Sequence, residues 1–152
     1  MLIRICLRAG LVSLALASPA AAQGDKAAQA AIRAALTQWM ADFNAGRAEK
    51  VCDLFAPDLV AQYRGQPERG WEALCDLLKR SLADRGKSYS YALAIHEILV
   101  EGDLAVVRLT WTLTVRGKDA AETTSFEPGI DIFRRQADGS WKISRYIAYE
   151  SP

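Results

Sequence analysis

The chain has 152 residues with 19 basic and 18 acidic side chains, so its formal net charge at pH 7 is only +1. A balanced charge without Lys/Arg clusters excludes a typical nucleic-acid-binding surface and a basic membrane-binding patch. The length suits one domain with a single hydrophobic core.

The first 22 residues have the pattern of a secretory signal peptide. A basic start precedes an apolar run at 9–17 that is too short to cross a bilayer, and small residues follow at 18–22. We expect cleavage after Ala22, which leaves a domain at 23–152 that is secreted or periplasmic. An uncleaved anchor helix is the alternative interpretation.

Two cysteines, Cys52 and Cys75, remain in this predicted mature domain. Because exported proteins fold in an oxidising compartment, we predict a disulfide between them. Closing a loop of this length would stabilise the domain by roughly 3–4 kcal/mol. Two buried free thiols are the alternative.

Apolar residues at helical spacing predict three helices at the start of the domain. Asp25 can cap the first, at about 26–44, which ends in an Asn-Ala-Gly stop. The second, at about 48–55, is stopped by Pro57, and the third covers about 71–83.

The remainder of the chain is rich in β-forming residues. A short strand is expected at 59–63, and longer strands at 89–101, 104–116, 122–134 and 141–149. Three helices followed by a four-stranded antiparallel meander indicate an α+β fold, with the helices packed on one face of a curved sheet.

The last two strands flank an Asp-Gly turn at 136–140, which predicts a β-hairpin. Counting from this turn, Asp131 pairs with Ser144, and Gly129 pairs with Tyr146. These four side chains would share one face of the sheet. The opposite face would carry four isoleucines: Ile130, Ile132, Ile143 and Ile147. The face with Asp131 could line a cavity or lie in solvent.

Five short motifs occur in order along the mature chain: Asn44-Ala45-Gly46, the segment 51–55, Arg69-Gly70-Trp71, the segment 101–106 and the segment 138–143. Their order and spacing resemble the SnoaL-like and ketosteroid-isomerase-like members of the nuclear transport factor 2-like superfamily. The resemblance covers the whole mature chain. It implies a cone-shaped, cystatin-like roll with a pocket between helix and sheet, commonly dimeric through the sheet. The superfamily hosts enzymes, ligand carriers and partner-binding subunits, so the fold alone does not select an activity.

The resemblance places Asp131 where ketosteroid isomerases have the Asp of their oxyanion hole. The positions of the oxyanion-hole Tyr, the catalytic base and a supporting Tyr hold three other residues: Trp39, Tyr63 and Leu78. An indole has no hydroxyl for an enolate, and a phenol is a poor base near neutral pH. We therefore expect no ketosteroid isomerase reaction by the family mechanism.

Arg108 bears on the ionisation of Asp131. In an apolar pocket Asp131 would have a raised pKa and could act as an acid, a base or a hydrogen-bond donor. Beside Arg108 it would be an ionised polar anchor. The register implied by the resemblance points Arg108 into the pocket, and we expect this orientation. The apolar face of the strand 104–116 favours the opposite one, with Arg108 in solvent.

We expect one catalytic candidate, Asp131. The predicted ligand-binding residues are Trp39, Phe43, Phe55, Tyr63, Arg108, Asp131 and Tyr146. His96, the only histidine, has no nearby acid cluster, so we expect a structural role for it, no metal site and no cofactor.

Three functions fit these observations. The first is an exported module that binds a small apolar or aromatic molecule, with Asp131 as its polar anchor. The second is an isomerase- or dehydratase-like enzyme that uses Asp131 as an acid or base. The third is a dimeric interaction subunit whose pocket is filled by its own side chains. We expect a homodimer that forms through the sheet. We do not expect the protein to bind nucleic acid or a membrane.

Overall fold

The computed structural model describes residues 19–118 and 121–151. The first 18 of the 22 residues predicted as a signal peptide therefore lie outside the described part. The described part contains two helices, α1 (Pro19–Asn44) and α2 (Trp71–Ala83). It also contains five strands: β1 (Phe55–Tyr63), β2 (Lys87–Glu101), β3 (Leu104–Gly117), β4 (Thr123–Arg135) and β5 (Trp141–Ala148).

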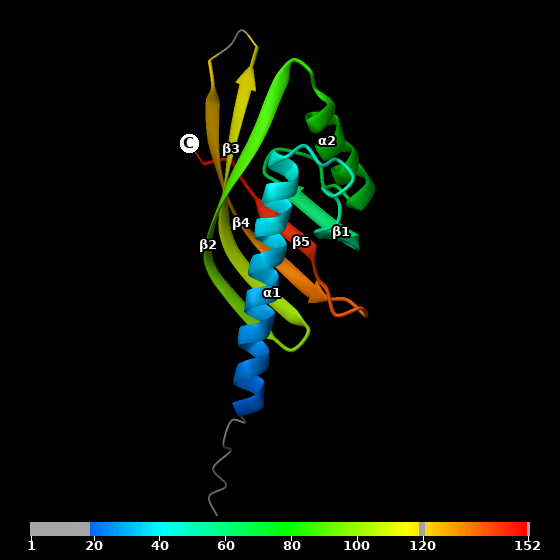
Figure 1. The fold of residues 1–152 in the computed structure, drawn as a ribbon, viewed down its shortest axis with the longest axis vertical. Coiled ribbons are helices and arrows are strands. Elements are labelled where there is room, and N and C mark those ends of the chain that lie inside the picture. Colours follow the sequence, from blue (N-terminus) through cyan, green and yellow to red (C-terminus); the bar gives the residue numbers. More distant parts are fainter. Residues whose placement is uncertain (1–18, 119–120, 152) are drawn as a thin grey trace, which may run out of the picture.

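The strands form one curved sheet in the order β1-β5-β4-β3-β2. Strands β2 to β5 are paired antiparallel, as predicted, and β1 adds to the edge parallel to β5. Figure 1 shows α1 lying along one face of the sheet, with α2 beside β1 at one end. The α+β class and the curved sheet are confirmed, but the sheet is mixed because β1 joins it.

The helix predicted at 48–55 is wrong. Its residues form consecutive turns, in which Asp53 N–H donates to Lys50 C=O and Phe55 N–H donates to Cys52 C=O. In an α-helix the Val51 carbonyl would accept from Phe55. Here it accepts a hydrogen bond of 2.8 Å from the Trp39 indole instead. A tertiary contact has therefore replaced the local helical pattern.

Strand β1 begins at Phe55, earlier than predicted, and so includes Pro57. The register with β5 is irregular between Phe55 and Val60. Proline lacks a backbone donor, and an irregular edge strand is a place where it is tolerated.

Helix α1 extends past its predicted start, so Asp25 lies inside it rather than at its cap. Alanine-rich sequence on both sides of Asp25 favours the continuous helix. The predicted end at Asn44 is confirmed, with Gly46 in the left-handed region at φ 71°. The Asn44 side chain also fastens the helix to β2, because it donates to Tyr91 C=O and accepts from Tyr91 N–H, both at 2.8 Å.

The predicted β4–β5 hairpin is present, but its register differs. Asp131 pairs with Tyr146, whereas Ile132 pairs with Arg145 and Phe133 with Ile143, so Ser144 is an extra residue in β5. One extra residue reverses the alternation of faces beyond it. Ile143 is therefore buried on the inner face of the sheet, and not on the outer face with the other isoleucines as predicted.

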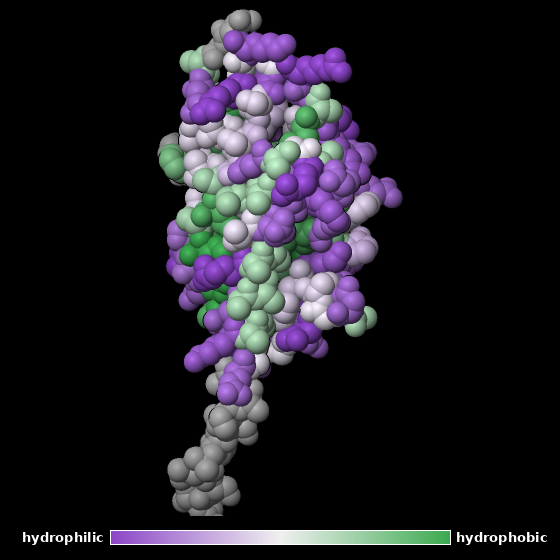
Figure 2. Space-filling view, in the orientation of Figure 1, coloured by the Kyte–Doolittle hydropathy of each residue, from purple (hydrophilic) through white to green (hydrophobic). Residues whose placement is uncertain are grey.

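The core lies between α1 and the inner face of the sheet. Its largest fully buried side chains are those of Phe43, Phe133, Ile32, Leu36 and Leu109. The surface in Figure 2 carries a pale green strip along α1 with purple hydrophilic residues beside it. This strip contains exposed alanines rather than large apolar side chains. Neither described helix has an apolar stretch of the length that a membrane span requires.

The predicted disulfide joins Cys52 to Cys75, with 5.5 Å between their Cα atoms. It connects the turns before β1 to the inner side of α2. Because α2 makes few contacts with the sheet apart from those near β1, this bond is a principal attachment of the helix.

Removing the disulfide should lower the free energy of unfolding by about 3 kcal/mol, since the unfolded chain regains the freedom of a 23-residue loop. Chemical denaturation of Cys52→Ser, Cys75→Ser and the double variant would measure this. The three variants should be equally destabilised, because each lacks the same bond. Two titratable thiols in the unreduced, unfolded wild-type domain would contradict the prediction.

Candidate functional site

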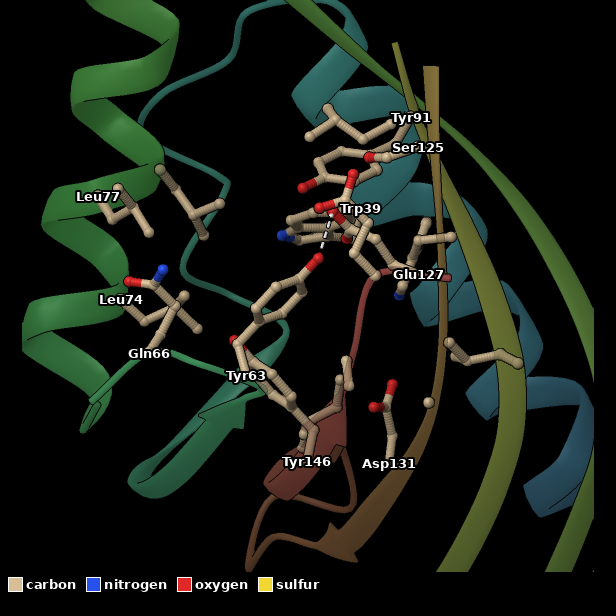
Figure 3. Close-up of a pocket in the computed structure, with 18 of the residues that line it drawn as sticks. Trp39, Tyr63, Gln66, Leu74, Leu77, Tyr91, Ser125, Glu127, Asp131 and Tyr146 are labelled. Atoms are coloured by element: carbon tan, nitrogen blue, oxygen red, sulfur yellow. Dashed lines mark hydrogen bonds between the residues drawn. The ribbon is translucent and has the colours of Figure 1, made fainter. Parts of the chain in front are cut away.

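A cavity of about 510 Å³ opens between α1, α2 and the inner face of the sheet. Both helices contribute to its wall, and polar side chains come from β1, β4 and β5 (Figure 3). Its apolar wall includes Leu54, Leu74, Leu77, Leu78, Leu109, Leu113 and Val115. A concave space of this size with a few polar groups suits a small organic molecule.

Strand β3 turns its apolar face toward the cavity. Leu109, Trp111 and Leu113 line the cavity, while Arg108 lies on the outer face with its side chain 58% exposed and an ion pair to Glu97 at 3.8 Å. The prediction that Arg108 lines the pocket is wrong. Burying a guanidinium without a partner is costly, so apolarity decides the register of this strand.

Asp131 lies on the inner face of β4, opposite Val107 of β3 and Tyr146 of β5. Asp131 is only 4% exposed, and its Oδ2 atom has no hydrogen-bond partner among residues 19–118 and 121–151. Burial raises the pKa of this carboxyl from 3.8 to about 7. With Arg108 on the other face, Asp131 is partly neutral near pH 7 and can donate as well as accept a hydrogen bond.

Glu127 is a second cavity carboxyl, four residues before Asp131 on the same strand. The Tyr63 hydroxyl donates to its Oε1 at 3.4 Å (Figure 3). Burial and the charge of Glu150 raise the pKa of Glu127 to about 6, and the Tyr63 hydrogen bond opposes the rise. Sequence reasoning missed Glu127, although the two-residue repeat of the strand already placed it on the face of Asp131.

Two phenols also line the cavity, Tyr63 from β1 and Tyr146 from β5. Burial and Glu127 raise the pKa of Tyr63 to about 12, and burial and Asp131 raise the pKa of Tyr146 to about 12. Both phenols are therefore neutral hydrogen-bonding groups at physiological pH. Neither is suited to act as a base.

Gly129 separates the two acidic residues on β4. A Cβ atom at this position would lie 2.8 Å from the Ile147 carbonyl oxygen and 3.2 Å from the Ala148 Cβ. Any larger residue would therefore push β5 away from β4. It would also occupy the part of the cavity between Glu127 and Asp131.

Aromatic rings close one end of the cavity. Trp39 contacts Trp111 and Tyr91, with ring centroids 5.1 and 5.6 Å away, and Phe55 edge-on at 6.0 Å. The predicted ligand-binding residue Phe43 does not line the cavity; it packs behind, against Trp39 and Tyr91. Because its N–H already binds Val51, the Trp39 indole offers a ligand its ring only.

Five of the seven predicted ligand-binding residues line the cavity: Trp39, Phe55, Tyr63, Asp131 and Tyr146. Among the lining residues that the sequence analysis did not assign to the site are Arg69, Tyr91, Trp111, Glu127 and Glu150. His96 lies on the outer face, where its Nε2 atom is 2.8 Å from the Thr110 hydroxyl. Within 19–118 and 121–151, no three His, Cys, Asp or Glu side chains are grouped to hold a metal ion.

A family model described as the SnoaL-like domain matches residues 36–146. A comparison with curated proteins finds no match. Among solved structures, a ketosteroid isomerase-like protein from Erwinia carotovora atroseptica is 25% identical, with a TM-score of 0.67 over 81% of this chain and 96% of its own.

Two further solved structures share the fold. An NTF2-like protein with a cystatin-like fold from Novosphingobium aromaticivorans is 21% identical, with a TM-score of 0.66 over 80% of each chain. A protein from Catenulispora acidiphila, solved in complex with S-DNPA, is 20% identical, with a TM-score of 0.68 over 82% of this chain and 94% of its own.

The raised pKa of Asp131 should make the domain less stable as pH rises. The folded state keeps this proton up to about pH 7, whereas the unfolded chain loses it near pH 4, so stability falls between those values. Asp131→Asn removes the titration. The wild type should lose unfolding free energy between pH 4 and pH 8 and the variant should not. The difference between the two proteins should therefore change by on the order of 2–4 kcal/mol in favour of the variant.

Denaturant unfolding at both pH values would measure this difference. Asp76→Asn, at an exposed position on α2, is the matched control and should show no such change. A constant offset between Asp131→Asn and wild type across the pH range would contradict a buried, titrating carboxyl.

Proposed function

The chain belongs to the SnoaL-like domain family, and we propose that it is a small-molecule-binding domain in which Asp131 fixes an oxygen atom of a mostly apolar ligand. The observation that carries this proposal is the Oδ2 atom of Asp131, which is buried at the cavity and has no hydrogen-bond partner in the described part of the chain. Buried polar atoms are normally hydrogen-bonded, so an orphan beside a cavity indicates a group that a ligand would satisfy.

The ionisation of Asp131 supports this role. With a pKa of about 7, the carboxyl is protonated in a substantial fraction of molecules at neutral pH and can donate to a carbonyl or hydroxyl oxygen. The leucines and valine of the wall would bury the apolar remainder of the ligand. The protein of this fold that was solved in complex with S-DNPA supports the proposal that the fold can hold a bound molecule.

An isomerase- or dehydratase-like enzyme is a second candidate, favoured by the two cavity carboxyls whose pKa values lie near neutrality. Asp131 would act as acid or base, assisted by Tyr63 or Tyr146. The family mechanism of ketosteroid isomerase has little support, because the Trp39 N–H is engaged and Tyr63 is too weak a base. A filled interaction subunit has less support than either, given the cavity volume.

We further propose export to the periplasm or outside the cell, on the basis of the signal-like pattern at 1–22. The Cys52–Cys75 disulfide is consistent with an oxidising compartment. We also propose a homodimer through the outer face of the sheet. There Ile130 is 48% and Ile147 61% exposed, beside Tyr149.

Native mass spectrometry of the domain purified from its own host should find a bound small molecule, which solvent extraction would identify. Asp131→Leu should lose it, or bind the extracted compound at least about tenfold more weakly, since one buried hydrogen bond to the ligand disappears. Asp131→Asn keeps a donor and should retain the compound. Equal binding by wild type and Asp131→Leu would contradict the anchor.

Turnover separates the second candidate from the first. For an enzyme, the rate with the extracted compound should follow a sigmoid or bell-shaped pH profile that disappears in Asp131→Asn. A carrier should bind the compound without changing it.

The proposed dimer predicts that Ile147→Glu yields monomers at concentrations where the wild type is dimeric, because a buried, unpaired carboxylate opposes association. Light scattering after size exclusion would report the mass. Ala34→Glu, on the exposed side of α1, is the control and should leave the dimer intact. A monomeric wild type would refute the dimer.

A further inference from the structure

The end of the cavity around Glu127 combines aromatic rings with carboxylates. Trp111 is the direct cross-strand neighbour of Glu127, so ring and carboxyl stand side by side on the inner face. Tyr91 and Trp39 pack on Trp111, and Tyr63 reaches Glu127 from the other side with its hydroxyl. Figure 3 shows the Tyr63, Trp39 and Tyr91 side chains gathered at this end, with Asp131 apart from them.

The charges at this end are uncompensated. Glu127 repels Glu150, which also lines the cavity, and within 19–118 and 121–151 no Lys, Arg or His forms an ion pair with either carboxylate. Arg69 is the one basic residue of the lining within the described ranges, and its guanidinium donates a hydrogen bond to the Gln66 side-chain oxygen. Its charge opposes the rise in the pKa of Tyr146.

The opposite end of the same cavity holds Asp131 with its unpartnered oxygen. The Cα atoms of Glu127 and Asp131 are separated by about 13 Å along an extended strand of this length. A ligand that reaches both ends would therefore meet aromatic rings and anionic oxygens at one end. At the other it would meet a carboxyl that is able to donate a hydrogen bond.

We propose that the ligand carries a positively charged amine, which Glu127 and Glu150 hold among the rings of Tyr63, Tyr91 and Trp111. An ammonium group is attracted both by a carboxylate and by the faces of aromatic rings, and each attraction strengthens as water is excluded. The inference rests on the proposed small-molecule binding and deepens it. The ligand is an amphipathic amine with a hydroxyl or carbonyl oxygen for Asp131, rather than an uncharged lipid-like compound or an organic acid.

A pair of probes with the same shape and different charge tests this directly. Choline and 3,3-dimethylbutan-1-ol both have a hydroxyl, but a quaternary nitrogen in the first replaces a carbon atom in the second. Binding can be followed by NMR titration of the wild-type domain at millimolar concentrations. At pH 8, choline should bind at least about fivefold more tightly than the alcohol.

The variant Glu127→Gln keeps the shape of the side chain and removes its charge, so the preference for choline should fall to about twofold or less. Glu101→Gln, at the exposed end of β2, is the matched control and should leave the preference unchanged. The dispersion of the NMR spectra reports whether each variant is folded.

The pH dependence provides a second readout. Because choline has a permanent charge, its affinity should rise between pH 5 and pH 7 as Glu127 ionises, and this rise should be absent in Glu127→Gln. Measuring both proteins with the Asp131→Asn substitution added removes the titration of Asp131. Glu150, the third carboxyl that lines the cavity, is present in both proteins, so the difference between them reports Glu127. Tyr63, Tyr91 and Tyr146 do not titrate in this range.

The outcomes separate this inference from the proposed function. Binding of the alcohol as tightly as choline would overturn the amine and leave small-molecule binding intact. Phenylacetate serves as a third, anionic probe. If it binds more tightly than choline and the alcohol, the amine proposal is overturned in favour of an anionic ligand at Arg69. A preference for choline that persists in Glu127→Gln would remove Glu127 from the site. No binding of choline to the wild type would overturn the amine, while small-molecule binding itself would still be decided by native mass spectrometry.

Discussion

The packing of Trp39 is the interaction on which the rest of the structure depends. Its ring lies where α1 meets β2, β3 and the start of β1, in contact with Tyr91, Trp111 and Phe55. Its N–H donates a hydrogen bond to the Val51 carbonyl. Because this carbonyl is engaged, the following residues form turns instead of a helix and lead into β1. One side chain thereby places α1 over the sheet, closes one end of the cavity and sets the path of the edge strand.

The cavity follows from the way in which the two helices share the sheet. Helix α1 covers the inner face along β2, and α2 is held beside β1 by the disulfide, so the face between them stays partly uncovered. Two carboxyl groups, Glu127 and Asp131, project from β4 into this space. Their burial costs free energy unless they are neutral or satisfied by another molecule. A site for ligands is a common reason for a protein to tolerate that cost.

The two faces of the sheet differ in their charged residues, and this difference leaves the acidic groups of the cavity available to a ligand. The outer face carries the ion pair of Arg108 with Glu97. On the inner face, acidic side chains lie beside aromatic rings and form no ion pair with a basic residue of the described chain. Gly129 preserves the space between the acids, because a side chain there would meet the backbone of β5. The same strand thus supplies the polar groups of the cavity and the gap that makes them accessible.

Local patterns were sufficient for α2, the end of α1 and the four antiparallel strands, since periodicity and turn residues are properties of neighbouring residues. The disulfide followed from the presence of only two cysteines in the predicted mature domain, and the family resemblance from the order of short motifs. Local patterns also placed Asp131 on a face with Tyr146, and could have placed Glu127 there. Only the tertiary structure decided the turns after Val51, the extra residue at Ser144 and the outward orientation of Arg108. Each of these depends on a partner or an environment distant in the sequence: the Trp39 indole, the register with β4, and the desolvation of the cavity wall.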